Sequence, residues 1–212
     1  MTTKKFDPTL YFITDSTPYT EEEFLYRVDL ALSGGATLIQ LREKNRSTRE
    51  YIDLANKVHE IARHYNIPLI IDDRIDVAQA VKSEGVHLGQ SDMPIKIARK
   101  ILGNDFIIGA TTKTVPQAKE AYEQGADYCG VGAIYPTTTK VKTVLTSTQT
   151  LSEICNAVPI PVNAIGGLNK NNLSVLEGIN ISGICVVSAI MHSENPKRET
   201  EILLDLARKL VC

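Results

Sequence analysis

The sequence predicts a single-domain α/β protein, a (β/α)₈ TIM barrel that spans residues 1–212. Three observations lead to this fold. Eight strand-like runs alternate with helix-like segments, the runs are apolar over nearly their whole length, and no segment rich in Pro, Gly or Ser divides the chain. Strands of this kind are typical of a parallel sheet that is covered by helices.

The expected strands are short runs rich in Val, Ile or aromatic residues. In chain order they lie at residues 10–14, 37–42, 67–72, 85–89, 106–111, 127–132, 160–166 and 183–188.

Helices are expected in the segments between these runs. Thr20 precedes acidic residues at the start of the segment 20–33, and "STRE" is a capping box that opens the segment 47–65. Because proline is tolerated in a first helical turn, further helices are expected to open at Pro94, Pro116 and Pro196. The remaining expected helices lie at 73–82, 147–157 and 170–178.

An open, doubly wound sheet would satisfy the same alternation of strands and helices. We favour the closed barrel because there are eight units, no "GxGxxG" follows the first strand, and no "GxxxxGK" occurs.

The composition argues against several classes of partner. A formal net charge of -2 gives no overall field that would attract nucleic acid or an anionic membrane. No apolar run approaches the length of a membrane span and no cleavable leader is evident, so we expect a cytoplasmic protein. The four cysteines match no metal or redox spacing, and we expect Cys129, Cys155, Cys185 and Cys212 to be reduced thiols.

Polar side chains gather where the expected strands end, which in such a barrel is the active-site mouth. Gln40, Arg42 and Lys44 share one face of their strand because side chains alternate, and Leu41 and Glu43 take the other face. The three polar residues either bind a ligand together or form the solvated tail of a fraying strand.

Two carboxylates also follow neighbouring strands. Asp73 and Asp92, together with Arg42, Lys44 and Lys140, suit a Mg²⁺ ion that is shared with a diphosphate. Taken alone, Asp73 would be read as a helix N-cap.

A phosphate site is expected after the last two strands, where Gly166 and Gly167 would let the backbone approach closely and Ser188 adds a hydroxyl at the start of the last helix. The glycine pair could also be a simple turn. His87 is either a hydrogen-bonded interior histidine or a catalytic group. The run "PTTTK", with Lys140, is either a hydroxyl-rich loop or a lid that closes over a phosphate.

With these motifs in order, the chain resembles the thiamine phosphate synthase family. The resemblance runs over nearly the whole chain and rests on "QLREK" (40–44), "DDR" (72–74), "GVHLGQSD" (85–92), "ADYCGVGAIYPTTTK" (126–140), "AIGGL" (164–168) and "VVSAI" (186–190).

The resemblance implies a Mg²⁺-dependent transferase of the thiamine biosynthesis pathway. It would couple 4-amino-2-methyl-5-hydroxymethylpyrimidine diphosphate with 4-methyl-5-(2-hydroxyethyl)thiazole phosphate, giving thiamine phosphate and diphosphate. In the family's proposed mechanism diphosphate leaves first, and the thiazole nitrogen then attacks the pyrimidine-methyl cation. The sequence leaves open whether the chain forms a homo-oligomer.

Carried over by position, the resemblance also implies roles for individual residues. Arg42, Lys44 and Lys140 would stabilise the leaving diphosphate, and Asp73 and Asp92 would bind Mg²⁺. The pyrimidine diphosphate would contact Gln40, Leu41, Arg42, Glu43, Lys44, Asp72, Thr111 and Lys140. The thiazole phosphate would contact Thr137, Thr138, Thr139, Gly167, Val187 and Ser188.

This sequence departs from the family's usual residues at three of these strand ends. Asp72 stands where the family usually has Asn, Thr111 where it usually has Ser, and Lys113 where relatives often carry His.

Three other functions are considered. A thiazole tautomerase shares the barrel, but its proposed acid/base histidine would fall at Lys113. An aldolase would use Lys140 as a Schiff-base nucleophile, although this lysine lies in a hydroxyl-rich loop rather than on a strand. A sensor that binds a phosphorylated ligand without chemistry would be expected to lack some of the metal ligands or lysines.

Overall fold

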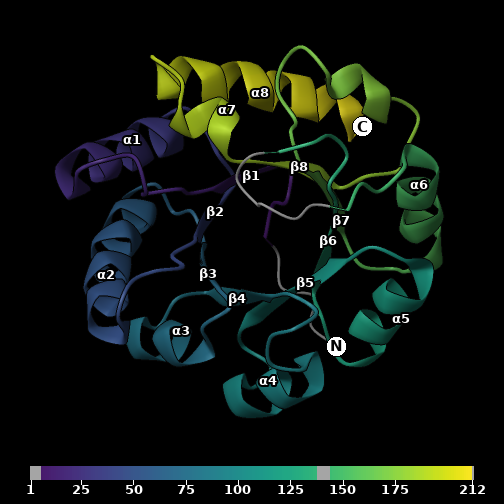
Figure 1. Cartoon of the computed structure of the whole chain (residues 1–212), viewed down its shortest axis with the longest axis horizontal. Helices are drawn as coiled ribbons and strands as arrows, with labels where there is room; N and C mark the ends of the chain where they lie inside the picture. The colour runs from purple at the N-terminus through teal and green to yellow at the C-terminus, as the bar shows by residue number, and fades with distance from the viewer. Residues whose placement is uncertain (1–5, 138–143, 212) are drawn as a thin grey trace.

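The structure is a computed structural model, and it describes residues 6–137 and 144–211. In this part of the chain, parallel strands follow one another around a closed barrel, with helices outside (Figure 1). Because β8 pairs with β1, the closed barrel is confirmed and the open sheet is wrong. The strands are β1 (Leu10–Ile13), β2 (Leu38–Leu41), β3 (Leu69–Asp72), β4 (Gly85–Leu88), β5 (Ile107–Thr112), β6 (Tyr128–Gly132), β7 (Val162–Ile165) and β8 (Gly183–Val186).

The helices lie where the capping signals indicate. Thr20 accepts a hydrogen bond from the backbone of Glu23, and Ser47 forms a reciprocal capping box with Glu50. The helices are α1 (Glu21–Ser33), α2 (Thr48–His64), α3 (Ile75–Val81), α4 (Ile95–Leu102), α5 (Val115–Glu123), α6 (Thr148–Ala157), α7 (Ser188–Met191) and α8 (Pro196–Leu210).

The segment after β7 differs from the prediction. In place of a helix over 170–178 there is one 3₁₀ turn, η1 (Leu173–Leu176). The side chain of Asn169 accepts from the backbone of Asn171, and that of Asn172 accepts from the backbone of Asn169. These local bonds compete with helix formation, so the chain turns instead of continuing a helix.

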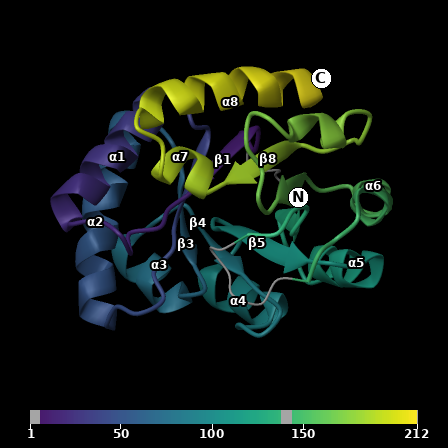
Figure 2. The ribbon, with the colours of Figure 1, turned by 45° about the horizontal axis from the view of Figure 1, so that its top comes forward.

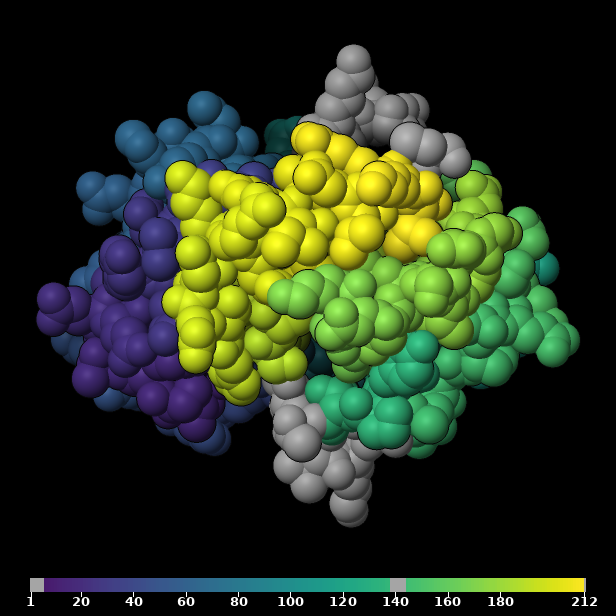
Figure 3. Space-filling model, turned by 90° about the horizontal axis from the view of Figure 1, so that it is seen from above, coloured from purple at the N-terminus to yellow at the C-terminus, as the bar shows by residue number. Residues whose placement is uncertain are grey.

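The expected strand 183–188 also ends early, at Val186, and the short helix α7 follows at once. Figures 1 and 2 both show α7 beside the end of β8, next to α8. In Figure 3, α8 lies across the outside of the barrel with α1 on its flank.

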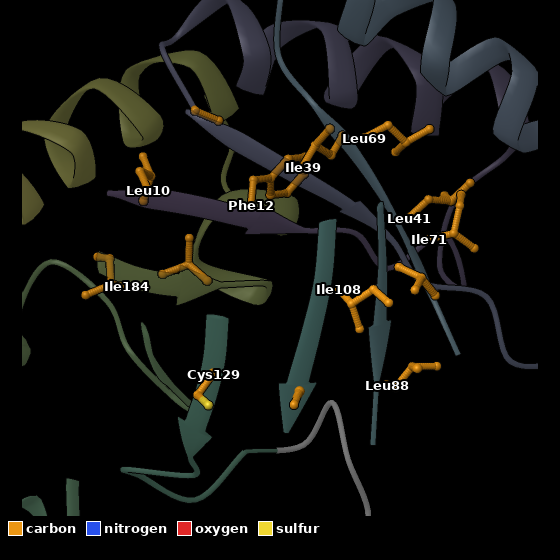
Figure 4. Close-up of a cluster of buried hydrophobic side chains, with 14 of the residues drawn as sticks. Leu10, Phe12, Ile39, Leu41, Leu69, Ile71, Leu88, Ile108, Cys129 and Ile184 are labelled. Atoms are coloured by element: carbon orange, nitrogen blue, oxygen red, sulfur yellow. The ribbon is translucent and has the colours of Figure 1, made fainter. Parts of the chain in front are cut away.

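Alternation along the strands separates two buried layers. One set of side chains packs between the sheet and the helices, and Figure 4 shows part of it, including Leu10, Phe12, Ile39, Leu41 and Ile71. The other set points into the barrel and consists of Tyr11, Ile13, Leu38, Ile70, Ile107, Tyr128 and Cys185. The barrel interior is therefore a packed core below the mouth at which the strands end.

Cys129, Cys155 and Cys185 are buried free thiols, as predicted, while Cys212 lies outside the described residues. Among the described helices, none combines the length and the apolar character that a membrane span requires.

Candidate active site

A cavity of about 600 Å³ opens at the carboxyl ends of the strands. All eight strands or the loops that follow them contribute to its wall, as the sequence predicts for a barrel of this type. The lining includes Tyr11, Ile13, Gln40, Arg42, Lys44, Asp72, Asp73, His87, Gln90, Asp92, Thr111, Lys113, Thr137, Gly166, Gly167, Val187 and Ser188.

The alternation predicted at the end of β2 is observed. Gln40, Arg42 and Lys44 line the cavity. Leu41 packs in the layer between sheet and helices, and Glu43 accepts hydrogen bonds from Ser16 and Arg46. The side chains of Leu41 and Glu43 therefore lie away from the cavity, and the structure separates them from the other predicted substrate contacts.

Lys44 joins the ends of β2 and β3 electrostatically. Its Nζ donates to Asp72 Oδ2 at 2.7 Å and also forms an ion pair with Asp73. Burial opposes the charge on Lys44, but the two aspartates outweigh it and raise the pKa of Lys44. Because Lys44 is bonded to two carboxylates, its ammonium group is held at a fixed place in the cavity wall.

Asp72 is the more buried of the two carboxylates on Lys44. Burial, and then the neighbouring charge of Asp73, raise the pKa of Asp72 to about 6, although Lys44 and Arg42 lower it. Arg42 Nε lies 3.9 Å from Asp72 Oδ2. Asp72 is therefore mainly ionised near neutral pH and is partly protonated in mild acid.

Asp73 does not cap α3, since the N-cap position belongs to Arg74 and has no side-chain capping bond. Its backbone is left-handed, with φ of 60°, and its side chain forms a hydrogen bond with Asp92. Burial opposes ionisation of Asp73, but the bonds with Lys44 and Asp92 outweigh it and lower its pKa. Burial, followed by the bond with Asp73, raises the pKa of Asp92.

The pair Asp73 and Asp92 fits a Mg²⁺ ion. Two carboxylates in contact are unfavourable when both are ionised, and a divalent cation between them would remove this repulsion. Within residues 6–137 and 144–211, no group of three or more His, Cys, Asp or Glu side chains forms a metal cage. Mg²⁺ usually takes one or two carboxylates and completes its shell with water and substrate phosphates, which suits this pair.

The predicted phosphate site lies on the opposite side of the barrel, because β7 is four strands from β3 in the closed ring. Gly166 and Gly167 have positive φ, and a Cβ on Gly166 would lie 2.3 Å from the Cβ of Ala133. The glycine pair is therefore required where the β7 loop packs on the β6 loop. Gly167 and Val187 line the cavity beside Ser188, which begins α7 and not the last helix, α8.

His87 is the hydrogen-bonded interior histidine of the first alternative, and it also lines the cavity. Its ring nitrogens lie 3.0 Å from the Tyr128 hydroxyl and 2.9 Å from Thr111 Oγ1. Tyr128 in turn contacts Tyr11. Neither tyrosine is among the predicted site residues, although their places in "LYFIT" and "DYCGVG" give them inward-facing positions that alternation could have identified.

The loop after β6 is described only in part. Thr137 lines the cavity, whereas Thr138, Thr139 and Lys140 lie outside the described residues. Lys113 also lines the cavity, and its Nζ donates to the backbone oxygen of Val144 at 3.1 Å, on the far side of that loop.

Comparison with known proteins shows which family this chain belongs to. Residues 10–190 match the family model described as thiamine monophosphate synthase. The chain is 47% identical over 203 residues to the thiamine-phosphate synthase of Clostridium tetani, which covers 96% of this chain and 97% of the relative. The thiamine-phosphate synthase of Methanobrevibacter smithii is also 47% identical, over 198 residues, 93% of this chain and 94% of the relative.

A solved structure agrees with this placement. The thiamine phosphate pyrophosphorylase of Pyrococcus furiosus superposes with a TM-score of 0.89 at 38% identity, covering 97% of this chain and 98% of that one. The likeness spans the barrel and the loops that form the cavity. The chain belongs to the thiamine monophosphate synthase family.

Proposed function

We propose that the cavity is the active site of a Mg²⁺-dependent thiamine-phosphate synthase. Its substrates are 4-amino-2-methyl-5-hydroxymethylpyrimidine diphosphate and 4-methyl-5-(2-hydroxyethyl)thiazole phosphate, and its products are thiamine phosphate and diphosphate. The observation that carries this proposal is that two groups of residues suited to phosphate binding line opposite sides of one cavity: Arg42, Lys44, Asp73 and Asp92 on one side, and the glycine loop with Ser188 on the other.

The diphosphate occupies the side formed by β2, β3 and β4. Arg42 and Lys44 supply positive charge there, and Asp73 and Asp92 would hold Mg²⁺, which would supply further positive charge to the diphosphate. When diphosphate departs, negative charge grows on its oxygens, and the two cations stabilise that charge without moving. Lys140, which lies outside the described residues, is proposed to act with them.

The thiazole phosphate occupies the side formed by the loops after β7 and β8. Gly167, Val187, Ser188 and Thr137 line the cavity there, and main-chain N–H groups and the hydroxyl groups of Ser188 and Thr137 are the donors proposed for this phosphate. A volume of about 600 Å³ lies within the usual range of small-molecule sites and leaves room for a second ring beside the first.

The coupling step depends on how the two substrates are positioned more than on a reacting group of the protein. Loss of diphosphate leaves a cation on the pyrimidine methyl carbon, and the thiazole nitrogen forms the new C–N bond with its own electron pair. No protein nucleophile is required. The protein contributes by holding the nitrogen close to the carbon and by excluding competing water.

The test is to incubate purified protein with both precursors, with Mg²⁺ or with EDTA, and to measure thiamine phosphate after oxidation to fluorescent thiochrome. We expect product that depends on Mg²⁺ and on Asp92, with Asp92→Asn reducing kcat by about 10²-fold or more. Asp53→Asn, an exposed carboxylate on α2, is the matched control and should leave the rate within about twofold.

Thiazole phosphate binding and thiazole isomerisation, measured on the same protein, separate two of the other functions. A folded protein that binds the thiazole phosphate but gives no product would contradict the synthase and favour a sensor. Isomerisation of the thiazole without coupling would favour a tautomerase. Lys113, which stands where relatives often carry His, lies in the cavity wall and gives no acid/base histidine at that position.

A further inference from the structure

A continuous chain of side-chain hydrogen bonds crosses the inside of the barrel. Gln40 Nε2 donates to the Tyr11 hydroxyl at 2.8 Å, and that hydroxyl lies 2.8 Å from the hydroxyl of Tyr128. The Tyr128 hydroxyl lies 3.0 Å from His87 Nδ1, and His87 Nε2 lies 2.9 Å from Thr111 Oγ1. The chain joins β2, β1, β6, β4 and β5 in that order.

This hydrogen-bond chain is largely buried along one wall of the cavity. Tyr11 and Tyr128 are 1% and 0% exposed, and Gln40, Tyr11, His87 and Thr111 line the cavity, whereas Tyr128 lies behind them. Space for the rings is provided by Gly109, where a Cβ would lie 2.1 Å from Tyr128 Cζ and 2.5 Å from His87 Nδ1. The absence of a side chain at Gly109 therefore leaves the space in which Tyr128 and His87 meet.

The number of protons that each group can donate gives this hydrogen-bond chain a direction. Each hydroxyl has one proton to donate, and a neutral imidazole has one N–H. Because Gln40 donates to Tyr11, Tyr11 donates to Tyr128, and Tyr128 donates to His87 Nδ1. The His87 proton is then on Nε2 and is donated to Thr111.

The direction also determines what the two ends present to a ligand. Gln40 uses its N–H₂ group within the chain, so its Oε1 is the atom that accepts from the cavity. Thr111 accepts within the chain, so its own proton is donated to the cavity. If the chain ran the other way, Gln40 would donate to the ligand and Thr111 would accept from it.

We propose that Tyr11, Tyr128 and His87 are positioning residues that make Gln40 an acceptor and Thr111 a donor toward the ligand. The site then selects a ring edge that carries both a hydrogen-bond donor and an acceptor. An aminopyrimidine has such an edge, so this inference rests on the proposed function for its ligand, although the chain itself can be tested without substrate.

The first test reverses the direction of donation in the hydrogen-bond chain by changing the residue at one end. An ionised carboxylate can only accept, so in Gln40→Glu the Tyr11 proton turns toward position 40, and His87 must donate from Nδ1 to Tyr128. Long-range ¹H–¹⁵N correlation spectra distinguish the two ring nitrogens, and His87→Asn identifies the signal among the four histidines. We expect the proton on Nε2 in the wild type and on Nδ1 in Gln40→Glu.

Two further variants make this result specific. Tyr11→Phe combined with Gln40→Glu interrupts the chain and should return the His87 signal to its wild-type form. Gln79→Glu places a carboxylate on the exposed surface of α3, away from this hydrogen-bond chain, and should leave the signal unchanged. A proton that stays on Nε2 in folded Gln40→Glu, or that moves equally in Gln79→Glu, would overturn the proposal.

The second test uses the reaction. Tyr11→Phe should raise KM for the pyrimidine diphosphate about fivefold to tenfold, with KM for the thiazole phosphate within about twofold. Tyr65→Phe, which removes a hydroxyl bonded to Asp29 on the helix layer, should change neither constant. Equal changes in both constants would contradict the positioning role. A wild type without product would instead contradict the proposed function. The NMR spectra would still test the direction of the hydrogen-bond chain.

Discussion

Lys44 shows how much of the candidate chemistry depends on single side chains. It contacts Asp72 and Asp73, and these carboxylates raise its pKa in spite of burial. The lysine is therefore charged at any pH at which the protein would work. Its removal would leave two neighbouring carboxylates without their shared cation, which is costly in a partly buried site.

We therefore expect Lys44→Ala to lower kcat by about 10²–10³-fold, because charge growing on the leaving diphosphate loses a fixed cation. Steady-state rates of thiamine phosphate formation check this. Lys57→Ala is the matched control, since Lys57 forms a surface ion pair with Glu21 on the helix layer. The control should stay within about twofold of the wild type, as exposed ion pairs contribute little. A Lys44→Ala rate as high as that of the control would contradict the assignment.

At the scale of elements, the β7 loop and the β6 loop fit together only because Gly166 has no side chain. Its φ is 106°, and a Cβ would meet Ala133 at 2.3 Å. Gly178, at φ of 77°, has nothing within 4 Å of the same atom. Both glycines have a positive φ that would strain any residue with a side chain, and only Gly166 has a close neighbour.

We expect Gly166→Ala to lower the free energy of unfolding by about 2–4 kcal/mol, from backbone strain and overpacking together. Gly178→Ala should cost about 1 kcal/mol, from the backbone alone. Urea denaturation of both variants measures the difference, and thiochrome assays should show a raised KM for thiazole phosphate only in Gly166→Ala. Equal stability losses would mean that the loop contact relaxes freely.

Glu84 connects three elements just before β4. Its carboxylate lies 3.1 Å from His59 Nε2 on α2 and accepts from the backbone of Leu69 on β3 at 2.8 Å. Burial opposes ionisation of Glu84, but these bonds outweigh it and lower its pKa. A lowered folded-state pKa adds stability above the unfolded pKa, and this stability is lost as the pH falls through the folded value.

Glu84→Gln should therefore lower the free energy of unfolding by about 1 kcal/mol at about pH 7, a value discounted for partial exposure. The difference from the wild type should shrink as the pH falls through the lowered folded-state pKa of Glu84, because both side chains are neutral below it. Urea titrations over a series of falling pH values measure this, with the exposed Glu60→Gln on α2 as control. A difference that does not change with pH would mean that the charge of Glu84 is irrelevant.

At the scale of the whole molecule, ligand binding should appear as thermal stability. The diphosphate side collects carboxylates and cations from β2, β3 and β4, so Mg²⁺ and diphosphate should bind there together. At about 100 times Kd, binding adds about 2.7 kcal/mol, which corresponds to roughly 5–10 °C in Tm for a chain of this size.

We expect inorganic diphosphate with Mg²⁺ to raise Tm by this amount, and each alone to raise it much less. EDTA should remove the increase without unfolding the protein. Asp73→Asn should lose the joint effect, while Asp53→Asn should keep it. Differential scanning calorimetry measures these shifts, and simple additivity in the wild type would contradict a shared site.

The barrel and the enzyme class could both be predicted from the sequence. Apolar runs with period-two alternation predicted the strands, and the family match confirms the predicted transferase that forms thiamine phosphate. Alternation at the end of β2 also predicted that Arg42 and Glu43 take opposite faces. The prediction failed after β7, because asparagine side chains competed locally with the helix that was expected there.

The sequence by itself determined the fold, the family and the strand ends at which the polar residues gather, because these follow from local periodicity and from ordered motifs. Only the tertiary structure decided which side chains meet. Tyr11 and Tyr128 are 117 positions apart, yet their hydroxyl groups lie 2.8 Å from each other. Such contacts depend on the closure and register of the barrel, which bring distant strands to the same depth and which no local pattern specifies.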